Sequence, residues 1–482
     1  MHSNILAFPG WLTVWFLFVL VLPLSADAQD NKIKNVLFII ADDLKASVLG
    51  CYGDPICKTP HIDSIAKRGM LFEKAYCNAT WCAPSRQSFM HSRYTNSKLV
   101  NGKNPVNLGQ HFRNQGMYSG RVGKIYHMRV PGDIIDGTDG QDIASSWTER
   151  FNTQGQEAHT PGDYACLNLN IFTDELEGRQ STRMPHRMFV TVQQDGDGSD
   201  QPDYKAADKA IEILNQRKDE PFFLAVGLVR PHYPNVAPRK YFEMYPWEDI
   251  KLPPNPTNDL ADIPKLGLGQ TLAGKNPIGQ YPDNQKRMWA GYYATVTFMD
   301  DQVGRILAEL DRLGLRESTA VVFTSDHGYH LGEHTFWQKL NLHEEVARVP
   351  LVVSAPGFST GRTQALAELV DLFPTFSELV GAEPPETVQG LSLLPVLKDA
   401  NAKVRDAALC FHRGYLLRDK DWAYMKYKDE SEELYNMNSD PKQFSNLAQG
   451  DKVRREQLIK MRAQLSAKLD KLGLNVKNKK TN

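Results

Sequence analysis

Long runs of apolar residues, each followed by polar side chains, recur along the first two thirds of the chain. Residues 35–41, 221–228 and 319–325 show no alternation of polar and apolar positions. Such runs are typical of central strands in a parallel sheet that is covered on both faces. Residues 203–216 and 287–313 instead carry apolar residues at helical spacing. The pattern therefore predicts an α/β fold with a large, mostly parallel sheet.

Metal-capable and basic side chains follow these three predicted strands. Asp42 and Asp43 follow the first, His232 comes shortly after the second, and Asp326 and His327 follow the third. The carboxyl ends of strands are where α/β sheets bind their ligands, and carboxylate oxygens suit a hard divalent cation. An Asp pair after a strand is as often only a turn or a helix cap. The local pattern leaves both interpretations open.

The segment 80–93, Thr-Trp-Cys-Ala-Pro-Ser-Arg-Gln-Ser-Phe-Met-His-Ser-Arg, is the strongest candidate for chemistry. Pro84 suits the first position of a helix because its φ is fixed and its missing N–H would be unpaired there. Cys82 would then lie just before the helix. Free N–H groups at that end, with the charge of Arg86 one turn later, predict a site for an anion.

Composition and charge describe an ordinary globular protein. Of 482 residues, 41% are hydrophobic and 23% are charged, and 56 Lys and Arg balance 57 Asp and Glu. No excess of positive charge favours binding to nucleic acid, which we do not expect as a partner. An anionic substrate must therefore be attracted by a local pocket.

The N-terminus has the features of an export signal. Residues 11–24 are apolar, and Ser25-Ala26-Asp27-Ala28 supplies an Ala-x-Ala cleavage site, although Lys and Arg are absent before the apolar run. A membrane-spanning helix needs about 20 apolar residues, so a permanent anchor is the weaker interpretation. We predict a signal peptide at 1–28, no stable membrane anchor, and export to a periplasm or outside the cell.

The six cysteines, at positions 51, 57, 77, 82, 166 and 410, allow an alternative role for Cys82. Cysteines in exported proteins are usually disulfide-bonded. If Cys82 instead serves as a precursor of a nucleophile, five thiols remain, and at least one of them must stay unpaired.

The residues around Cys82 resemble a known family. Cys-x-Pro-Ser-Arg at 82–86, with Arg93 downstream, is similar to the core signature of the type I, formylglycine-dependent sulfatases. In that family the cysteine is oxidised to formylglycine, whose hydrate attacks sulfate. The usual continuation is Thr-Gly-Arg, whereas this chain has His91-Ser92-Arg93 and keeps only the arginine.

Further landmarks of the family occur in the right order along the chain. They are Thr59-Pro60-x-Ile62-Asp63, Gly123-Lys124-x-x-His127, Arg230-Pro231-His232, Ser325-Asp326-His327-Gly328, Trp337-Gln338-Lys339 and an ending from Glu433 to Leu447. Many sulfatases have Asn where His327 stands, and histidine is typical of iduronate-2-sulfatase-like enzymes. Those enzymes carry Lys-Pro-His where this chain has Arg230-Pro231-His232.

The resemblance implies an alkaline-phosphatase-like α/β/α sandwich with a large mixed, mostly parallel sheet and a small C-terminal antiparallel subdomain. We expect a catalytic domain at 29–395 and the subdomain at 396–482. Short apolar segments between 407 and 427 and helical spacing from 452 to 472 are consistent with the latter. Residues 130–200 and 246–285 are interpreted as long loops that carry specificity.

The resemblance also implies roles for individual residues. One calcium ion would be bound by Asp42, Asp43, residue 82, Asp326 and His327. Cys82, Arg86, Lys124, His127, His232 and Lys339 would form the catalytic set. Within it, His232 is assigned as the general acid and His127 as the base, and these two roles could be exchanged.

The predicted function is hydrolysis of sulfate esters at the end of a sulfated saccharide, with a formylglycine-generating or equivalent enzyme as maturation partner. Two alternatives remain. A phosphatase or phosphonate monoester hydrolase of the same fold could use the same cation and charges. A non-catalytic protein that binds sulfated glycans could keep Cys82 as a thiol. The sequence predicts neither the sugar nor the oligomeric state.

Overall fold

The computed structural model describes residues 1–2, 33–95, 105–179, 184–269, 271–449 and 452–474. The predicted signal peptide at 1–28 lies almost entirely outside them. No helix within these ranges is both long and apolar enough to span a membrane. Residues Lys32–Asn482 form one unit by their contacts.

A large mixed sheet crosses this unit, and nine of its strands fall within the described residues. Its order is β14 (Arg348–Val349), β2 (Met70–Tyr76), β15 (Leu351–Ser354), β11 (Thr319–Ser325), β1 (Asn35–Asp42), β8 (Phe222–Pro231), β3 (Tyr118–Gly123) and β4 (Glu149–Phe151), and β16 (Gly361–Glu368) also pairs with β2. From β11 to β4 every pairing is parallel, whereas β15 is antiparallel to both its neighbours. The strands that end in candidate site residues, β11, β1 and β8, are therefore direct neighbours.

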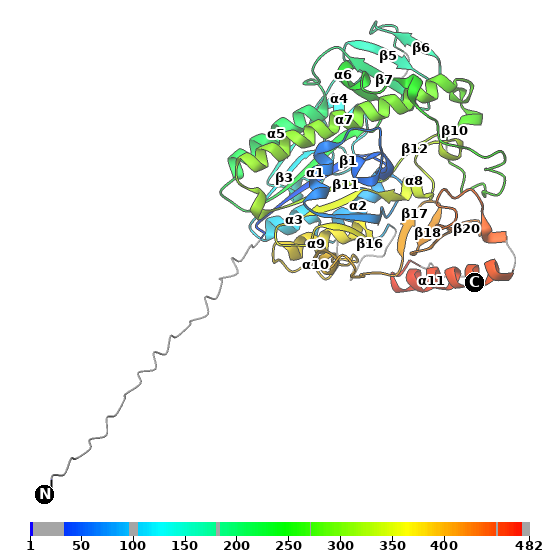
Figure 1. Cartoon of the computed structure of the whole chain (residues 1–482). Helices are drawn as coiled ribbons and strands as arrows, with labels where there is room; N and C mark the ends of the chain where they lie inside the picture. Colours follow the sequence, from blue (N-terminus) through cyan, green and yellow to red (C-terminus); the bar gives the residue numbers. More distant parts are fainter. Residues whose placement is uncertain (3–32, 96–104, 180–183, 270, 450–451, 475–482) are drawn as a thin grey trace, which may run out of the picture. The chain divides into compact units, whose positions relative to one another are not determined.

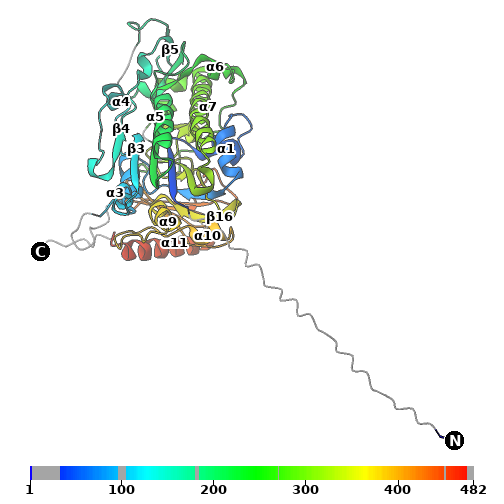
Figure 2. The same cartoon turned by 90° about the vertical axis from the view of Figure 1, so that its left-hand side faces the viewer.

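Helices cover both faces of the sheet (Figures 1 and 2). One layer contains α1 (Pro60–Lys67), α5 (Pro202–Arg217) and α7 (Pro282–Arg312), and the other contains α2 (Cys82–His91), α3 (Leu108–Asn114) and α9 (Leu372–Leu379). Because side chains alternate along a strand, Leu37 and Ile39 join the core beneath the first layer. Phe38 packs edge-on against Phe89 and Phe376 in the second. This arrangement confirms the predicted α/β/α sandwich.

The prediction of loops between residues 130 and 200 is wrong in part. Within it lie β4, β5 (Gly162–Cys166), β6 (Ile171–Thr173) and β7 (Val190–Gln194). The last three form a separate four-stranded sheet with β9 (Asn235–Pro238), in the order β6, β5, β7, β9. These strands have only three to five residues, so each gives too short an apolar pattern to be recognised.

The C-terminal region contains the expected antiparallel sheet. Its strands are β17 (Ala408–Phe411), β18 (Gly414–Arg418), β19 (Trp422–Tyr427) and β20 (Glu432–Asn436), each paired with the next. Helix α11 (Lys452–Lys471) packs Leu458, Met461 and Leu465 against strand residues such as Leu409 and Tyr424. The domain boundary at 395/396 stays a prediction.

Candidate active site

Cys82 is the first residue of α2, with Trp81 at the N-cap position. Pro84 is the third residue of the helix rather than the first. Proline has no N–H group, but no hydrogen bond is lost at this position, because the N–H groups of the first turn have no acceptor within the helix. The first N–H inside α2 to bond back along the helix is that of Ser85, 3.1 Å from the carbonyl oxygen of Trp81. Cys82 itself is almost fully buried.

Three buried carboxylates gather in front of Cys82. Asp42 and Asp43 lie at the end of β1, and Asp326 follows the neighbouring strand β11. Asp43 N donates to Asp326 Oδ1 at 3.2 Å. All three side chains are inaccessible to solvent. The parallel register of the two strands therefore brings together residues that are almost 300 positions apart.

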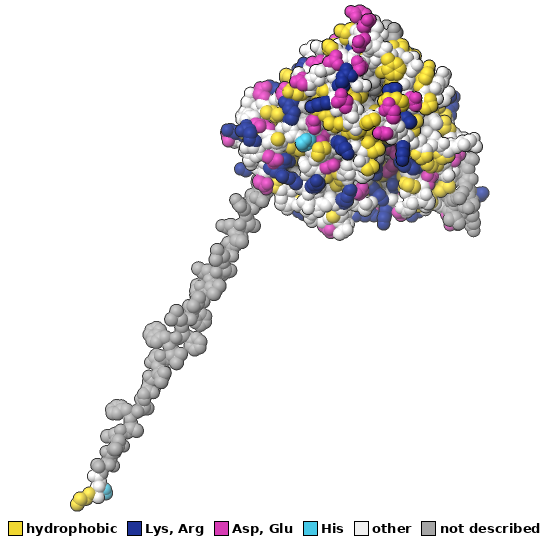
Figure 3. Space-filling model, turned by 45° about the horizontal axis from the view of Figure 1, so that its top comes forward, with side chains coloured by type: hydrophobic (Ala, Val, Ile, Leu, Met, Phe, Trp, Pro, Cys, Tyr) yellow, Lys and Arg dark blue, Asp and Glu magenta, His cyan; other side chains and the backbone are white. Residues whose placement is uncertain are grey.

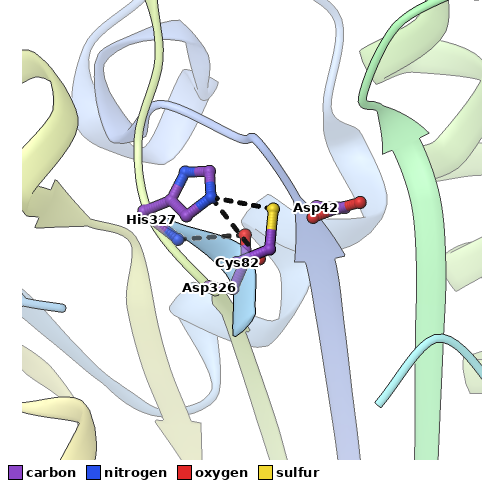
Figure 4. Close-up of side chains that lie close together, drawn as sticks. All are labelled: Asp42, Cys82, Asp326 and His327. Atoms are coloured by element: carbon purple, nitrogen blue, oxygen red, sulfur yellow. Dashed lines mark hydrogen bonds and ion pairs between the residues drawn. The ribbon is translucent and has the colours of Figure 1, made fainter. Parts of the chain in front are cut away.

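The Cys82 thiol points into this cluster (Figure 4). Its Sγ atom lies 3.2 Å from His327 Nε2, 3.9 Å from Asp43 Oδ1 and 2.9 Å from Lys339 Nζ. The nearest approach of two other cysteines is the 3.7 Å between the Sγ atoms of Cys77 and Cys410. The structure thus places residue 82 beside the predicted metal ligands.

Three cations neutralise the carboxylates. Arg86 donates from Nε to Asp326 Oδ2 at 2.9 Å and from Nη2 to Asp42 Oδ1 at 3.1 Å. Lys124, just after β3, also pairs with Asp42. Lys339, which follows β13 (Phe336–Gln338), lies 2.6 Å from Asp43 Oδ1.

Two histidines direct a ring nitrogen towards the same carboxylates. His327 Nδ1 lies 2.9 Å from Gly328 O, and His232 Nδ1 lies 2.6 Å from Tyr233 O. A carbonyl can only accept, so in both rings Nδ1 carries the proton and Nε2 of the neutral form has a free lone pair. Because its Nε2 lone pair is free, His327 is oriented as a metal ligand would be. Nε2 of His232 is 3.7 Å from Asp43 Oδ2.

His127 is placed less directly. It follows Lys124 in the loop after β3 and is partly exposed, and its Nδ1 atom has no hydrogen-bond partner among the described residues. Burial lowers the pKa of His127 to about 4, and the charge of Lys124 adds to the effect. The ring is therefore neutral at ordinary pH and could accept a proton.

The donor atoms fit a divalent cation. Ligand atoms of Asp42, Cys82, Asp326 and His327 lie within 4.8 Å of one another. Asp43 Oδ2 is buried and has no hydrogen-bond partner among the described residues. Buried carboxylates at this spacing repel unless a cation lies between them. Carboxylate oxygens with one imidazole nitrogen are suitable ligands for such an ion.

Burial and neighbouring charges shift the pKa values of the residues in this cluster in opposite directions. Burial acts to raise the pKa of Asp42, but Lys124, His232 and Arg86 outweigh it and hold that pKa well below its usual value. Burial raises the pKa of Asp43 despite Lys339. Burial also raises the pKa of the Cys82 thiol well above its usual range. An unmodified Cys82 is thus a neutral thiol and a weak nucleophile.

Two supporting residues were assigned no role from the sequence. Tyr292 of α7 donates its hydroxyl to Asp43 O at 2.6 Å and accepts from Lys45 N at 3.1 Å. This contact supports Asp43 in a left-handed conformation, with φ of 63°. Ser85 donates to the carbonyl oxygen of Asp326. Ser85 belongs to the recognised motif, whereas Tyr292 lies among apolar helix residues and gives no signal.

The strand ends, the helix terminus and the charged cluster together define a hydrolase of the alkaline-phosphatase-like class, which cleaves esters of tetrahedral oxyanions. The profile of the Sulfatase family matches residues 34–382, and that of the N-sulphoglucosamine sulphohydrolase C-terminal region matches residues 332–473. The chain therefore belongs to the sulfatase family and is a sulfuric ester hydrolase.

The chain is also similar to individual relatives and solved structures. Iduronate 2-sulfatase of Homo sapiens is 32% identical over 412 residues, which cover 78% of this chain and 70% of that protein. A structure solved in complex with its substrate D-glucosamine-2-N,6-O-disulfate has a TM-score of 0.70 at 21% identity and covers 93% of this chain and 100% of its own. The phosphonate monoester hydrolase of Silicibacter pomeroyi has a TM-score of 0.73 at 22% identity, covering 91% and 95%. The two structures show the fold alone.

Proposed function

We propose that the protein removes a sulfate ester from the end of a sulfated saccharide, in the manner of iduronate-2-sulfatase-like enzymes, and that residue 82 acts as formylglycine. The observation that carries this proposal is the position of Cys82 Sγ, 3.2 Å from His327 Nε2 and 2.9 Å from Lys339 Nζ. The likeness to iduronate 2-sulfatase, together with His327 in place of Asn, supports the choice of substrate class.

Asp42, Asp43, Asp326 and His327 would hold the metal ion, which we propose is calcium. When bound, such an ion supplies positive charge to sulfate oxygens and to residue 82. Calcium is favoured over magnesium because its larger, flexible shell can accept oxygens from both the sulfate and residue 82. Arg86 is committed to Asp42 and Asp326, so its role is to fix the carboxylates rather than to move with the substrate.

The remaining residues would handle charge and protons. One hydroxyl of the hydrated aldehyde of residue 82 would lose its proton to water and attack sulfur, while Lys124 and Lys339 neutralise the sulfate oxygens. The bond between sulfur and the sugar oxygen breaks, and His232 would give that oxygen a proton. His127 would then take the proton of the second hydroxyl on residue 82, so that sulfate leaves and the aldehyde forms again.

His232 must be protonated to act as the acid. Burial holds its pKa well below the usual value, although Asp42 acts in the opposite direction. A sulfate group close to Nε2 would add negative charge and raise that pKa. Substrate binding would thus create the acid where the proton is needed.

The proposal includes the location, the domain organisation and the maturation of the enzyme. An exported chain with a signal peptide at 1–28, a catalytic domain at 29–395 and a small domain at 396–482 would meet extracellular or periplasmic glycans. Conversion of Cys82 requires a formylglycine-generating or equivalent enzyme. Figure 3 shows basic and acidic side chains interspersed over one face, without a region of a single sign. This mixture is consistent with attraction of the sulfate by the local site.

The test is the loss of turnover on replacement of Cys82. Cys82→Ala should lower kcat for 4-nitrophenyl sulfate and sulfated saccharides by more than about 1,000-fold, while Cys77→Ala, a buried cysteine outside the cluster, should keep kcat within about threefold. Full activity of Cys82→Ala would refute the proposal. The fold is also similar to that of a phosphonate monoester hydrolase, and this activity is the alternative function. Faster turnover of phosphonate monoesters than of every sulfate ester would favour the alternative.

A further inference from the structure

The ring of Tyr233 marks a meeting point of three chain segments beside the site. The His232 ring lies 4.1 Å away between centroids, and Lys339 Nζ is 5.9 Å from the Tyr233 centroid. Arg187 Cζ is 5.8 Å from the same centroid. A fourth cation therefore lies about as close to this ring as Lys339 does, yet no role for it has been described above.

Arg187 differs from the other cations of the site. Arg86, Lys124 and Lys339 each pair with a buried carboxylate. Within the described part of the chain, Arg187 has no acidic partner, and its Nε atom is buried without a hydrogen-bond acceptor. A buried donor without a partner destabilises the folded protein. The guanidinium is therefore prepared for an anion that the described residues do not provide.

The segment that carries Arg187 is held against the segment that carries Lys339. Gln338 Nε2 contacts Met184 Sδ at 4.0 Å. Burial raises the pKa of Tyr233, and the charges of Lys339 and Arg187 both act against that rise, so both lie within electrostatic range of the hydroxyl. Met184 is 44% exposed and Trp81, next to Cys82, is 52% exposed. Solvent therefore reaches both the segment that carries Arg187 and the residue next to Cys82.

We propose that Arg187 is a specificity-determining residue that binds a second anionic group of the substrate, on the same sugar as the scissile sulfate ester or next to it. This inference rests on the proposed function. The planar fork of a guanidinium matches two oxygens of a carboxylate or a sulfate. The second group would be a uronic acid carboxylate or a further sulfate.

The test compares substrate pairs that differ only in the second anion. One pair is a 2-O-sulfated uronide and its methyl ester, and the other is N-acetylglucosamine 6-sulfate and glucosamine N,6-disulfate. 4-Nitrophenyl sulfate has no second anion and reports the chemical step. Arg187→Gln should lower kcat/KM by about 10- to 100-fold for the doubly charged member of a pair, mainly through KM. It should leave the singly charged member and 4-nitrophenyl sulfate within about twofold.

The matched control is Arg287→Gln. Arg287 also stacks on an aromatic ring, with Cζ 3.8 Å from the Trp247 centroid, and its Nε likewise has no partner among the described residues. It lies in a separate groove with Phe172 and Trp247, so its replacement should change neither pair. Arg187→Lys keeps the charge without the fork and should show an intermediate loss. It provides the readout if Arg187→Gln does not fold.

The possible results separate the explanations. A loss confined to the uronide identifies a carboxylate, and a loss confined to the disulfate identifies a second sulfate, and either supports the proposal. Equal losses for the doubly and singly charged members, or no loss for any substrate, would overturn it. If the unaltered enzyme hydrolyses 4-nitrophenyl sulfate but neither doubly charged sugar, this inference fails while the sulfatase function stands. No turnover of any sulfate ester would refute both.

Discussion

At the scale of single residues, the charges of the site favour a further cation once an anionic substrate binds. Asp42, Asp43 and Asp326 face Arg86, Lys124 and Lys339, so three negative charges meet three positive ones. A sulfate ester adds negative charge to this balanced set. A divalent ion would more than offset that charge, and Asp43 Oδ2, which has no hydrogen-bond partner among the described residues, is positioned to contact it.

Removal of the metal should therefore abolish turnover reversibly. After chelation and dialysis, hydrolysis of 4-nitrophenyl sulfate should fall more than about tenfold and the unfolding midpoint should drop, because an ion that binds only the folded state stabilises it. Calcium should restore both, and Asp43→Asn should need a higher calcium concentration. Unchanged turnover in chelator would contradict the metal site, and better restoration by magnesium would contradict the choice of calcium.

The acid limb of the pH profile should reflect His127. A base must be neutral, and burial together with Lys124 lowers the pKa of His127 to about 4. Activity should accordingly persist as pH falls below 6.5 and decline only near pH 4, where the ring gains its proton. The measurement is kcat against pH for 4-nitrophenyl sulfate, with His127→Gln as the comparison. A decline near 6.5 that disappears in His127→Gln would disprove the low pKa.

Most site residues could be predicted because they are chemically distinctive and occur at strand ends or in a motif. Asp42, Cys82 and Asp326 are of this kind, and the structure brings them together. Tyr233 and Arg187 could not be predicted, because their relation depends on how residues 184–187 pack against a distant segment. Contacts of that kind leave no local pattern in a sequence.

At the scale of elements, the length of the apolar pattern decided which predictions were correct. The strands at 35–41 and 319–325 and the long helix before the latter were predicted within a few residues of β1, β11 and α7. The sheet formed by β5, β6, β7 and β9 was missed because its strands are short. Long elements buried on every side carry their own signal, whereas short peripheral strands depend on neighbours.

One element depends on a cap from another. The N–H groups of His61 and Ile62 at the start of α1 donate to Asp300 of α7, at 3.0 and 2.8 Å. Asp300→Ala would leave both donors without a partner and should lower the free energy of unfolding by about 1–3 kcal/mol. Asp301→Ala serves as control, since Asp301 is partly exposed and contacts the side chains of Tyr241 and His61 rather than the N–H groups of α1. Equal effects of the two variants in chemical denaturation would refute the capping role.

At the scale of the whole molecule, the C-terminal region is joined to the main sheet by buried polar contacts. Arg405 pairs with Glu368 and Asp371, both fully buried. His343 Nε2 lies 3.2 Å from Glu433 Oε2. These contacts cross the predicted boundary at 395/396, so the two parts should depend on each other for stability.

Removal of residues 396–482 should therefore prevent stable folding. Loss of Arg405 alone would leave two buried carboxylates without their cation, which costs about 3–5 kcal/mol for a broken buried pair. The full chain should unfold in a single calorimetric transition, and the truncated chain should be insoluble or lack a transition. A soluble, cooperatively folded 29–395 fragment would contradict this dependence.

The central claim, that residue 82 works as formylglycine, is tested most directly by the mass of the peptide that contains it. Trypsin should release residues 75–86, which include both Cys77 and Cys82. In protein matured by its own host, this peptide should be about 18 Da lighter than the unmodified sequence, with fragment ions that place the change at residue 82. Fully active enzyme whose residue 82 is entirely unmodified cysteine would contradict the account.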